Sequence, residues 1–364
     1  MTDPKTARRL VIVTGAGRSG TSMVAGALTR LGYTVPPPVM GATEANPRGH
    51  YEPLWVINFH KRHLRRASVN TMDSRPDAPS LVDKVCKGRR PQATLTTWLE
   101  KAFEQPHLVI KDPRAFWFRD LWVGAARSVG VEPTFLTMLR HPAEVVGSRT
   151  TYYGGKNARQ RADREISLVA GWFNATTVNE HTSRGHRRTF ALYDELLTDW
   201  RGTLLRISDT LDLGLDERVL RSTEPHAVDD FIDPGLHRIR ADWTNVSAPQ
   251  QLVDLAEGAW QILTGHASGS TDLDAAALTE LDRLRATYGT MYKDAVALSH
   301  DEIQRRVRAA ERRIRKEIEA GEVSTPGQGR ATSAAEETGL GSLGRGVVRA
   351  TRAEVAAWRR SRRR

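Results

Sequence analysis

The sequence predicts an α/β fold in which a parallel sheet lies between two layers of helices. Short runs rich in β-branched residues alternate with segments of helical periodicity. Each run ends in charged or glycine-rich residues, which is typical of strands whose carboxyl ends form a binding site. Beyond about residue 249 the periodicity is helical only. The last part of the chain therefore predicts a helical C-terminal extension.

The elements follow one another in a regular order. The predicted strands are residues 10–14, 107–111, 133–139 and 188–193. The predicted helices are residues 21–31, 54–64, 93–103, 115–129, 143–149, 160–182, 249–263, 271–295 and 300–318. Residues 67–92 contain prolines and predict an irregular segment that covers the site. The chain divides into a domain over 1–300, a helical extension over 301–320 and a flexible basic tail over 321–364.

The segment 8–31, RRLVIVTGAGRSGTSMVAGALTRL, predicts a strand, a glycine-rich turn and a helix that begins near Thr21. Such a turn directs several backbone N–H groups and the positive end of a helix dipole at one point. We therefore expect a phosphate or another tetrahedral anion there. The loop residues assigned to this anion are Gly17, Arg18, Ser19, Gly20, Thr21 and Ser22.

Two common motifs overlap on this turn, and neither fits completely. Gly15, Gly17 and Gly20 match G-x-G-x-x-G, but no acidic residue closes a second strand about 20 residues later. Residues 15–22 also keep the spacing of the P-loop motif G-x-x-x-x-G-K-[ST], with Thr21 in place of the lysine. Without that lysine a P-loop-like fold remains, but a nucleoside triphosphatase loses its charge on the β- and γ-phosphates.

A second anion anchor is predicted at the end of the third strand. Arg140 closes that strand and Ser148 lies eight residues later in the following helix. Because this spacing lets the guanidinium and the hydroxyl converge beside a helix start, the pair is suited to bind one anion. Arg140 alone would more often form a surface salt bridge.

Both anchors resemble those of sulfotransferases that use 3′-phosphoadenosine 5′-phosphosulfate (PAPS), in particular the bacterial branch. Residues 18–22 (RSGTS) resemble the 5′-phosphosulfate loop, and residues 140–148 (RHPAEVVGS) resemble the segment that binds the 3′-phosphate. Residues 46–52 (NPRGHYE), 111–114 (KDPR), 193–197 (YDELL) and the segments 231–234 and 238–243 are also similar to that family. The resemblance covers roughly residues 8–245.

The resemblance implies that PAPS is the co-substrate and that no metal is needed. It implies nucleotide contacts from Tyr193 and Arg240 in addition to the two anchors. A hydroxyl of a carbohydrate, a glycolipid or a small metabolite would accept the sulfuryl group. Arg18, where other members have lysine, would stabilise the leaving oxygen, and Lys111 is the alternative cation.

The acceptor hydroxyl also needs a general base. Glu52 is the first candidate, because the family pattern implies a catalytic glutamate in this loop. His50 competes with it, since an imidazole pKa near 6.5 suits a base, and Asp112 is a weaker candidate. A purely structural interpretation makes Glu52 a carboxylate that stabilises the first turn of a helix.

Composition limits the cellular setting. Of the net charge of +11, residues 301–364 carry +7, with sixteen Lys and Arg and nine Asp and Glu, which leaves +4 for residues 1–300. Cys86 is the only cysteine, so there is no disulfide framework and no cysteine-based zinc site. The sequence lacks a signal peptide and a membrane-spanning run. We therefore expect a cytoplasmic enzyme without a nucleic-acid partner.

The basic tail allows two interpretations. Arg345, Arg349 and Arg352 share one helical side, which predicts an amphipathic helix that contacts anionic lipid at the inner face of the membrane. A disordered tail that only aids solubility explains the same composition. Two other functions remain as alternatives: a P-loop nucleotide kinase or triphosphatase, and a non-enzymatic membrane-associated interaction protein. The acceptor and the oligomeric state cannot be read from the sequence.

Overall fold

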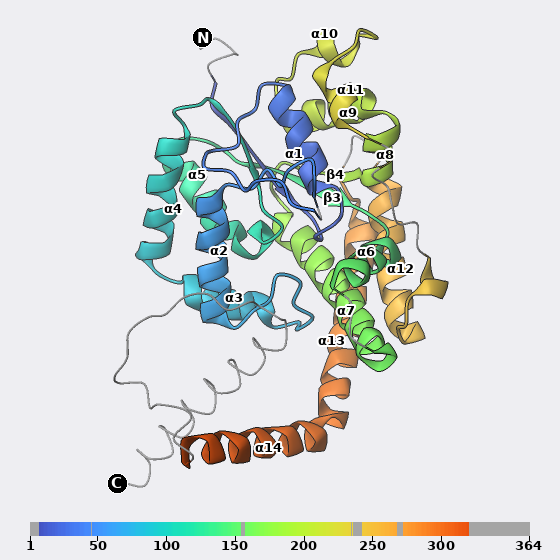
Figure 1. Ribbon diagram of the computed structural model, residues 1–364. Coiled ribbons are helices and arrows are strands. Elements are labelled where there is room, and N and C mark those ends of the chain that lie inside the picture. Colours follow the sequence, from blue (N-terminus) through green and yellow to red (C-terminus); the bar gives the residue numbers. More distant parts are fainter. Residues whose placement is uncertain are drawn as a thin grey trace. The chain divides into compact units, whose positions relative to one another are not determined.

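Four parallel strands form the centre of the molecule (Figure 1). The computed structural model describes residues 7–44, 46–153, 157–233, 235, 242–267 and 272–319. The strands, in the order β2-β1-β3-β4, are β1 (Arg9–Thr14), β2 (His107–Lys111), β3 (Thr134–Leu139) and β4 (Arg188–Leu192). All neighbours pair in parallel. The predicted α/β fold with a parallel sheet is confirmed, and each strand agrees with its predicted bounds to within one residue at either end.

Helices connect the strands, because a parallel pair needs a crossover connection. The elements between β1 and β3 are α1 (Thr21–Arg30), α2 (Leu54–Ala67), α3 (Ala78–Cys86), α4 (Arg89–Ala102), the 3-10 turn η1 (Ala115–Phe118) and α5 (Arg119–Ser128). Those between β3 and residue 231 are α6 (Pro142–Tyr153), α7 (Ala158–Ser183), α8 (Tyr193–Thr198), α9 (Trp200–Leu211), α10 (Glu217–Leu220) and α11 (Ala227–Phe231). The remaining ones are η3 (Trp243–Asn245), α12 (Gln250–Ala267), α13 (Ala275–Leu298) and α14 (His300–Glu319).

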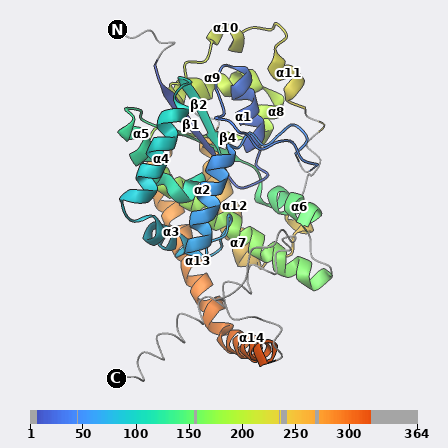
Figure 2. The same cartoon turned by 60° about the vertical axis from the view of Figure 1, so that its left-hand side comes forward.

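The sheet is covered on both faces, which gives the predicted three layers. Side chains of a strand alternate between its two faces. Leu10 and Ile12 of β1 therefore pack in one cluster with α2, α3, α4, α5 and α7. Val11 and Val13 pack in the other cluster with α1, α8, α9, α10 and α11. Figures 1 and 2 show α4 and α5 on one side of the sheet and α1 and α9 on the other.

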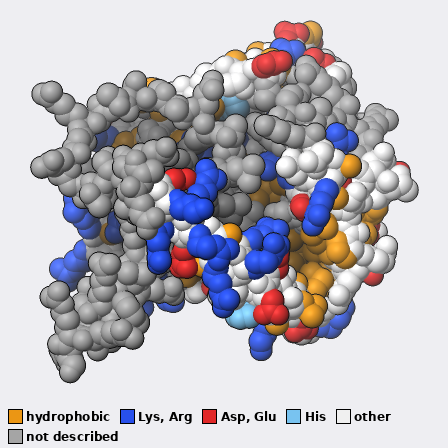
Figure 3. All heavy atoms as spheres, turned by 60° about the horizontal axis from the view of Figure 1, so that its bottom comes forward, with side chains coloured by type: hydrophobic (Ala, Val, Ile, Leu, Met, Phe, Trp, Pro, Cys, Tyr) orange, Lys and Arg blue, Asp and Glu red, His pale blue; other side chains and the backbone are white. Residues whose placement is uncertain are grey.

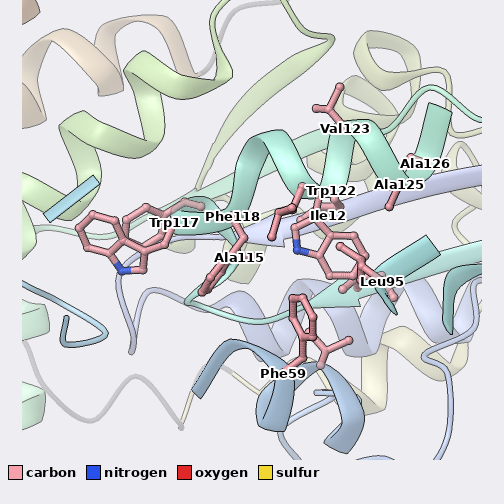
Figure 4. Packing of buried hydrophobic residues seen from close by; sticks show 14 of the residues in the cluster. Ile12, Phe59, Leu95, Ala115, Trp117, Phe118, Trp122, Val123, Ala125 and Ala126 are labelled. Carbon is pink, nitrogen blue, oxygen red and sulfur yellow. The ribbon is translucent and has the colours of Figure 1, made fainter. Parts of the chain in front are cut away.

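Aromatic side chains fill the first of these clusters. Phe59 from α2 and Phe118 and Trp122 from η1 and α5 gather near Ile12 of β1 (Figure 4). Trp122 has no exposed surface, and the ring centroids of Phe59 and Phe118 lie 6.4 Å apart. This packing holds α2 against the carboxyl ends of β1 and β2, where the predicted site lies.

The prediction of an irregular segment over residues 67–92 is correct for residues 68–77 but wrong beyond them. Helix α3 follows, and α4 begins at Arg89 instead of residue 93. Proline is compatible with a helix here, because Pro79 lies in the first turn of α3, where its missing N–H is not needed. Ala78 and Val82 bury the inner side of α3 against the aromatic cluster.

The chain forms two compact units, residues 1–289 and 290–364. The second contains α14, which corresponds to the predicted helical extension. None of the side chains described in α14 is fully buried. Figure 3 shows several blue Lys and Arg side chains on the surface. The proposed domain boundary at residue 300 stays a prediction, and the basic tail over 321–364 lies outside the described residues.

Within the described part of the chain, no helix combines the length and the apolar character that crossing a membrane requires.

Candidate functional site

A cavity of about 250 Å³ lies at the carboxyl ends of β1, β2 and β3. The loops that follow parallel strands meet at this edge of a sheet, which is where such folds bind ligands. The structure brings most of the residues singled out in the sequence to this one cavity. Those on its wall are Gly17, Arg18, Gly20, Thr21, Ser22, His50, Glu52, Lys111, Arg140, Ser148 and Tyr193.

Three of the predicted residues are not among those on this wall, and one of them, the weaker candidate base Asp112, is fully buried. Ser19 is 1% exposed and faces a second cavity of about 10 Å³ behind the loop, which Thr137 and Asn179 also line. Among the described residues its Oγ has no hydrogen-bond partner. Arg240 lies in the segment 236–241, outside the described residues, so its predicted contact is not placed.

The glycines of the loop are required by its close contacts. Gly15 has a φ of +140°, and a Cβ there would lie 2.5 Å from the carbonyl oxygen of Met138 in β3. Gly20 has a φ of +86°, and its Cβ would lie 2.5 Å from Cδ2 of Tyr193. A side chain at either position would strain the backbone and collide with its neighbour. The loop is therefore packed directly against the ends of β3 and β4.

Arg18 joins the two predicted anion anchors. Its Nε donates a hydrogen bond of 3.0 Å to Oγ of Ser148, and its carbonyl oxygen accepts one of 3.3 Å from Arg140. Its φ of +83° is unusual for a residue with a side chain, and such strain is typical of functional sites. The anchors thus form one connected structure across β1 and β3.

The guanidinium of Arg140 is held on three sides. Its Nε lies 2.7 Å from Oε2 of Glu144 on the next turn of α6, and its centre lies 4.5 Å from the ring of Tyr193. Arg140 is buried, with an exposed fraction of 6%. A cation fixed in this way beside a cavity is prepared for an anion, because little conformational freedom is lost on binding.

Helix α1 presents its N-terminus to the same cavity. It begins at Thr21, no side chain caps it by a hydrogen bond, and no acidic residue stands in its first turn. Thr21 and Ser22 line the cavity, so the open amides and the positive helix end face the ligand space. Ser22 also anchors the next loop, since its Oγ donates to the carbonyl of His50 and accepts from Nδ2 of Asn46.

Glu52 is held between two cations. Nζ of Lys111 lies 2.6 Å from its Oε1, and a terminal nitrogen of Arg114 lies 2.9 Å from its Oε2. The carboxylate is 6% exposed but still forms part of the cavity wall. Both of its oxygens therefore accept charge-assisted hydrogen bonds, which fix its position.

His50 lies on the same wall in a different electrostatic setting. Burial lowers the pKa of its imidazole, and the positive charges of Lys111 and Arg18 lower it further, while Glu52 opposes them. The ring is consequently neutral at pH 7. Its Nε2 pairs with Oγ1 of Thr43 at 2.9 Å. A neutral imidazole at the edge of a cationic cavity can accept a proton.

The sequence did not indicate several residues that shape the site. Arg114 belongs to the KDPR segment, in which the sequence indicated only Lys111 and, less strongly, Asp112 as candidates. Arg149 of α6 was also missed, although one of its terminal nitrogens would lie 2.9 Å from a Cβ at Gly17. Arg48 and Asp233 line the cavity and form an ion pair of 3.5 Å. No local pattern shows such a pair, because its partners are far apart in the sequence.

Among the described residues, no group of three or more His, Cys, Asp and Glu side chains is arranged to hold a metal ion. The charged groups on the cavity wall are mainly cations, which suits an anionic ligand.

Comparison with known proteins gives limited similarity. No family model matches the chain, and no curated protein matches it. One similar solved structure is the sulfotransferase domain from the Synechococcus PCC 7002 olefin synthase, with 19% identity over 79% of this chain and 96% of that domain and a TM-score of 0.36. Another is the sulfotransferase domain from the curacin biosynthetic pathway, with 13% identity over 77% and 97% and a TM-score of 0.34. With TM-scores below 0.5, these similarities carry no inference about activity.

Proposed function

We propose that the chain is a sulfotransferase that moves a sulfuryl group from PAPS to a hydroxyl of a carbohydrate, a glycolipid or a small metabolite. The observation that carries this proposal is the direct bond between the two anion anchors, from Nε of Arg18 to Oγ of Ser148. It places a glycine loop and an Arg–Ser pair on one cavity. A donor with phosphate groups at its 5′ and 3′ ends needs two such anchors.

The residues of the cavity fit this donor. The N-terminus of α1 and Arg18 would bind the 5′-phosphosulfate, since both supply positive charge and hydrogen-bond donors. Arg140 and Ser148 would bind the 3′-phosphate. Tyr193, whose ring holds Arg140, would support that contact.

The chemistry requires charge stabilisation and proton removal. The bond from sulfur to the bridging oxygen of the donor breaks, a bond from sulfur to the acceptor oxygen forms, and the nucleotide keeps the electron pair. Arg18 and Lys111 would stabilise the negative charge on the departing oxygen. The proton of the acceptor hydroxyl goes to a base on the cavity wall.

Glu52 and His50 remain the candidates for that base. Glu52 already accepts hydrogen bonds from Lys111 and Arg114, so each of its oxygens has a cationic donor. His50 is neutral and can take a proton directly. Replacing Glu52→Gln and His50→Asn separately tests the two roles, because only loss of the base should abolish transfer while nucleotide binding persists.

Binding of the nucleotide product tests the proposal. Isothermal titration with 3′-phosphoadenosine 5′-phosphate (PAP) should show binding, and Arg140→Ala should weaken it by about 10-fold or more, the effect of losing a charge-assisted contact. Arg127→Ala is the matched control, because Arg127 is an exposed arginine paired with Glu132. Adenosine 5′-phosphate, which lacks the 3′-phosphate, should bind less tightly. No heat, or equal affinity for both nucleotides, would contradict the proposal.

The acceptor requires a separate search. Incubation of the protein with PAPS and a cell extract, followed by mass spectrometry, should reveal compounds that gain a sulfuryl group. The Glu52→Gln/His50→Asn double variant is the control, because it removes both candidate bases. A kinase or triphosphatase would instead show Mg²⁺-dependent ATP turnover. The presence of Thr21 at the position of the P-loop lysine disfavours that activity.

The cytoplasmic location and the peripheral membrane contact also stay proposals. The contact rests on the basic composition of the tail over 321–364. Vesicles of phosphatidylserine should bind the full chain but not a protein truncated after residue 320. Neutral vesicles should bind neither form. A non-enzymatic membrane protein would show this binding without any affinity for PAP.

A further inference from the structure

A chain of hydrogen-bonded side chains connects the aromatic core to the wall of the cavity. Nε1 of Trp122 lies 3.1 Å from Nε2 of His60, and Nδ1 of His60 lies 3.0 Å from Oδ2 of Asp112. Oδ1 of Asp112 accepts a bond of 2.6 Å from Nε of Arg114, and Arg114 in turn binds Glu52. Trp122, His60 and Asp112 have no exposed surface.

These contacts determine which nitrogen of His60 carries the proton. An indole N–H can only donate, so Nε2 of His60 must be the acceptor for Trp122. In a neutral imidazole the proton then sits on Nδ1, which donates it to Asp112. Burial lowers the pKa of His60, and the nearby charges of Asp112, Arg114 and Glu52 partly compensate one another. His60 is therefore a neutral donor to Asp112 at pH 7.

The ring of His60 cannot turn away from this role. The ring of Phe118 stacks on it, with centroids 4.5 Å apart and planes within 2° of parallel. Phe59 and Trp122 contact it edge-on. Figure 4 shows Phe59, Phe118 and Trp122 in the hydrophobic cluster. The direction of the Nδ1–H bond is consequently set by packing.

Asp112 connects His60 with Arg114, the residue that binds Glu52 on the cavity wall. His60 engages one of its oxygens, and the other accepts bonds from both the backbone amide and Nε of Arg114. The bond from Nε orients the guanidinium of Arg114, and its terminal nitrogen binds Glu52. Without His60, one oxygen of a fully buried carboxylate would lack its partner, so Asp112 would be drawn to rearrange.

We propose that His60 is a positioning residue of the cavity: through Asp112 and Arg114 it holds the carboxylate of Glu52 in place. This inference rests on the proposed function, because the position of Glu52 matters for transfer only if the cavity transfers a sulfuryl group. The simpler interpretation is that His60 only fills space in an aromatic core. It predicts that any side chain of similar size will serve.

Two substitutions at His60 separate these interpretations. His60→Asn keeps an N–H donor near the position of Nδ1, whereas His60→Gln places its amide near Nε2 and removes the donor to Asp112. Trp122→Phe keeps the aromatic packing and removes only the N–H that selects the tautomer. Thermal unfolding monitors the folding of each variant, and Trp122→Phe serves as the test if His60→Gln does not fold.

The kinetic measurement is sulfuryl transfer from PAPS, with 4-nitrophenol as the probe acceptor. We expect His60→Gln to lower kcat by about 10-fold to 100-fold, the effect of a displaced group in an active site. KM for PAPS and the Kd of PAP should stay unchanged, because Arg18, Arg140 and Ser148 bind one another and Arg140 binds Glu144, all outside this chain of residues. His60→Asn should recover most of the rate. Equal losses in His60→Asn and His60→Gln, or a normal kcat in His60→Gln, would overturn the proposal.

Structural readouts decide the proposal independently of turnover. In ¹⁵N-histidine-labelled protein, His60 should give a neutral Nδ1–H signal at pH 7 that changes in Trp122→Phe. Crystal structures should show the contact between Arg114 and Glu52 retained in His60→Asn and broken in His60→Gln. A protonated or Nε2–H imidazole, or an intact contact in His60→Gln, would refute the positioning role. If the wild-type protein binds no PAP, the proposed function fails while these readouts still decide the positioning role.

Discussion

Among single residues, Glu52 and His50 show how two neighbours in a loop acquire different electrostatic settings. Glu52 turns inward, where Lys111 and Arg114 bind both of its oxygens. His50 remains on the cavity wall with a lowered pKa, because burial and the nearby cations disfavour its charged form. The side chain of Glu52 is therefore held in place by two cations, whereas the neutral imidazole of His50 can accept a proton.

The pH dependence of transfer should reveal which of the two is the base. If His50 is the base, the rate falls as the pH drops through its pKa, because protonation removes the lone pair. The pKa is lowered, so this acidic limb should lie below about pH 6.5, the ordinary value for histidine. The measurement is kcat/KM between pH 5 and 8.

His50→Asn is the matched variant for this profile. It should remove the acidic limb together with most of the rate, while PAP binding persists. An unchanged limb in His50→Asn would assign the base role to another group, with Glu52→Gln as the next variant to profile.

Gly20 and Gly32 allow the effect of backbone strain to be compared with the effect of a steric clash. Gly20 and Gly32 both have positive φ values, of +86° and +97°, but only a Cβ at Gly20 meets another side chain. Each change to alanine should cost about 1–2 kcal/mol of stability through the backbone. Gly20→Ala should in addition displace Tyr193 and weaken PAP binding.

Urea unfolding and isothermal titration measure these two effects. Gly32→Ala is the control for backbone strain, since nothing lies within 4 Å of its Cβ. Normal PAP affinity in Gly20→Ala would show that the loop and Tyr193 are not coupled.

Among the elements, helices α1 and α11 pack directly against each other beside the cavity. A Cβ at Gly26 of α1 would collide with the ring of Phe231, the last residue of α11. Arg30, one turn later, places its guanidinium 3.8 Å from the same ring. Phe231 also lines the cavity, so this packing determines one of its walls.

A double-mutant cycle tests the contact. Gly26→Ala should destabilise the protein by about 1–3 kcal/mol, the usual effect of overpacking, despite the better helix propensity of alanine. In the background of Phe231→Ala the same change should cost less, because only Cε2 of Tyr51, 2.9 Å from the added Cβ, then remains as a close neighbour. Urea unfolding of the four proteins gives the coupling energy, and additive effects would contradict the contact.

At the scale of the whole molecule, the cavity belongs to one of the two compact units. The residues that line the cavity fall between Gly17 and Asp233, all in the first compact unit. The side chains described in α14 are all at least partly exposed. Among the residues that the structure describes, none after α13 lines the cavity.

Truncation after Leu298 tests this division. The shortened protein should bind PAP with the affinity of the full chain and unfold cooperatively, because its cavity and both core clusters are complete. Isothermal titration and thermal unfolding measure the two properties. Loss of binding on truncation would mean that the second unit contributes to the site.

Much of the molecule follows from local sequence patterns. The four strands, the glycine loop and the Arg140–Ser148 pair were predictable, because each depends on residues close together in the chain and on the rule that parallel strands end at one edge. Helix α3 was missed because Pro79 in a first turn has the same local appearance as a helix breaker.

Local sequence patterns specify the parallel α/β sheet, the glycine loop and the Arg140–Ser148 pair. The position of Glu52 between Lys111 and Arg114, and the contact of His60 with Asp112 across 52 residues of chain, follow only from the three-dimensional packing. The physical reason is that burial and side-chain pairing depend on contacts between distant segments, which leave no periodic signal. Hydrophobic alternation specifies which elements form, and their packing then specifies which polar groups meet.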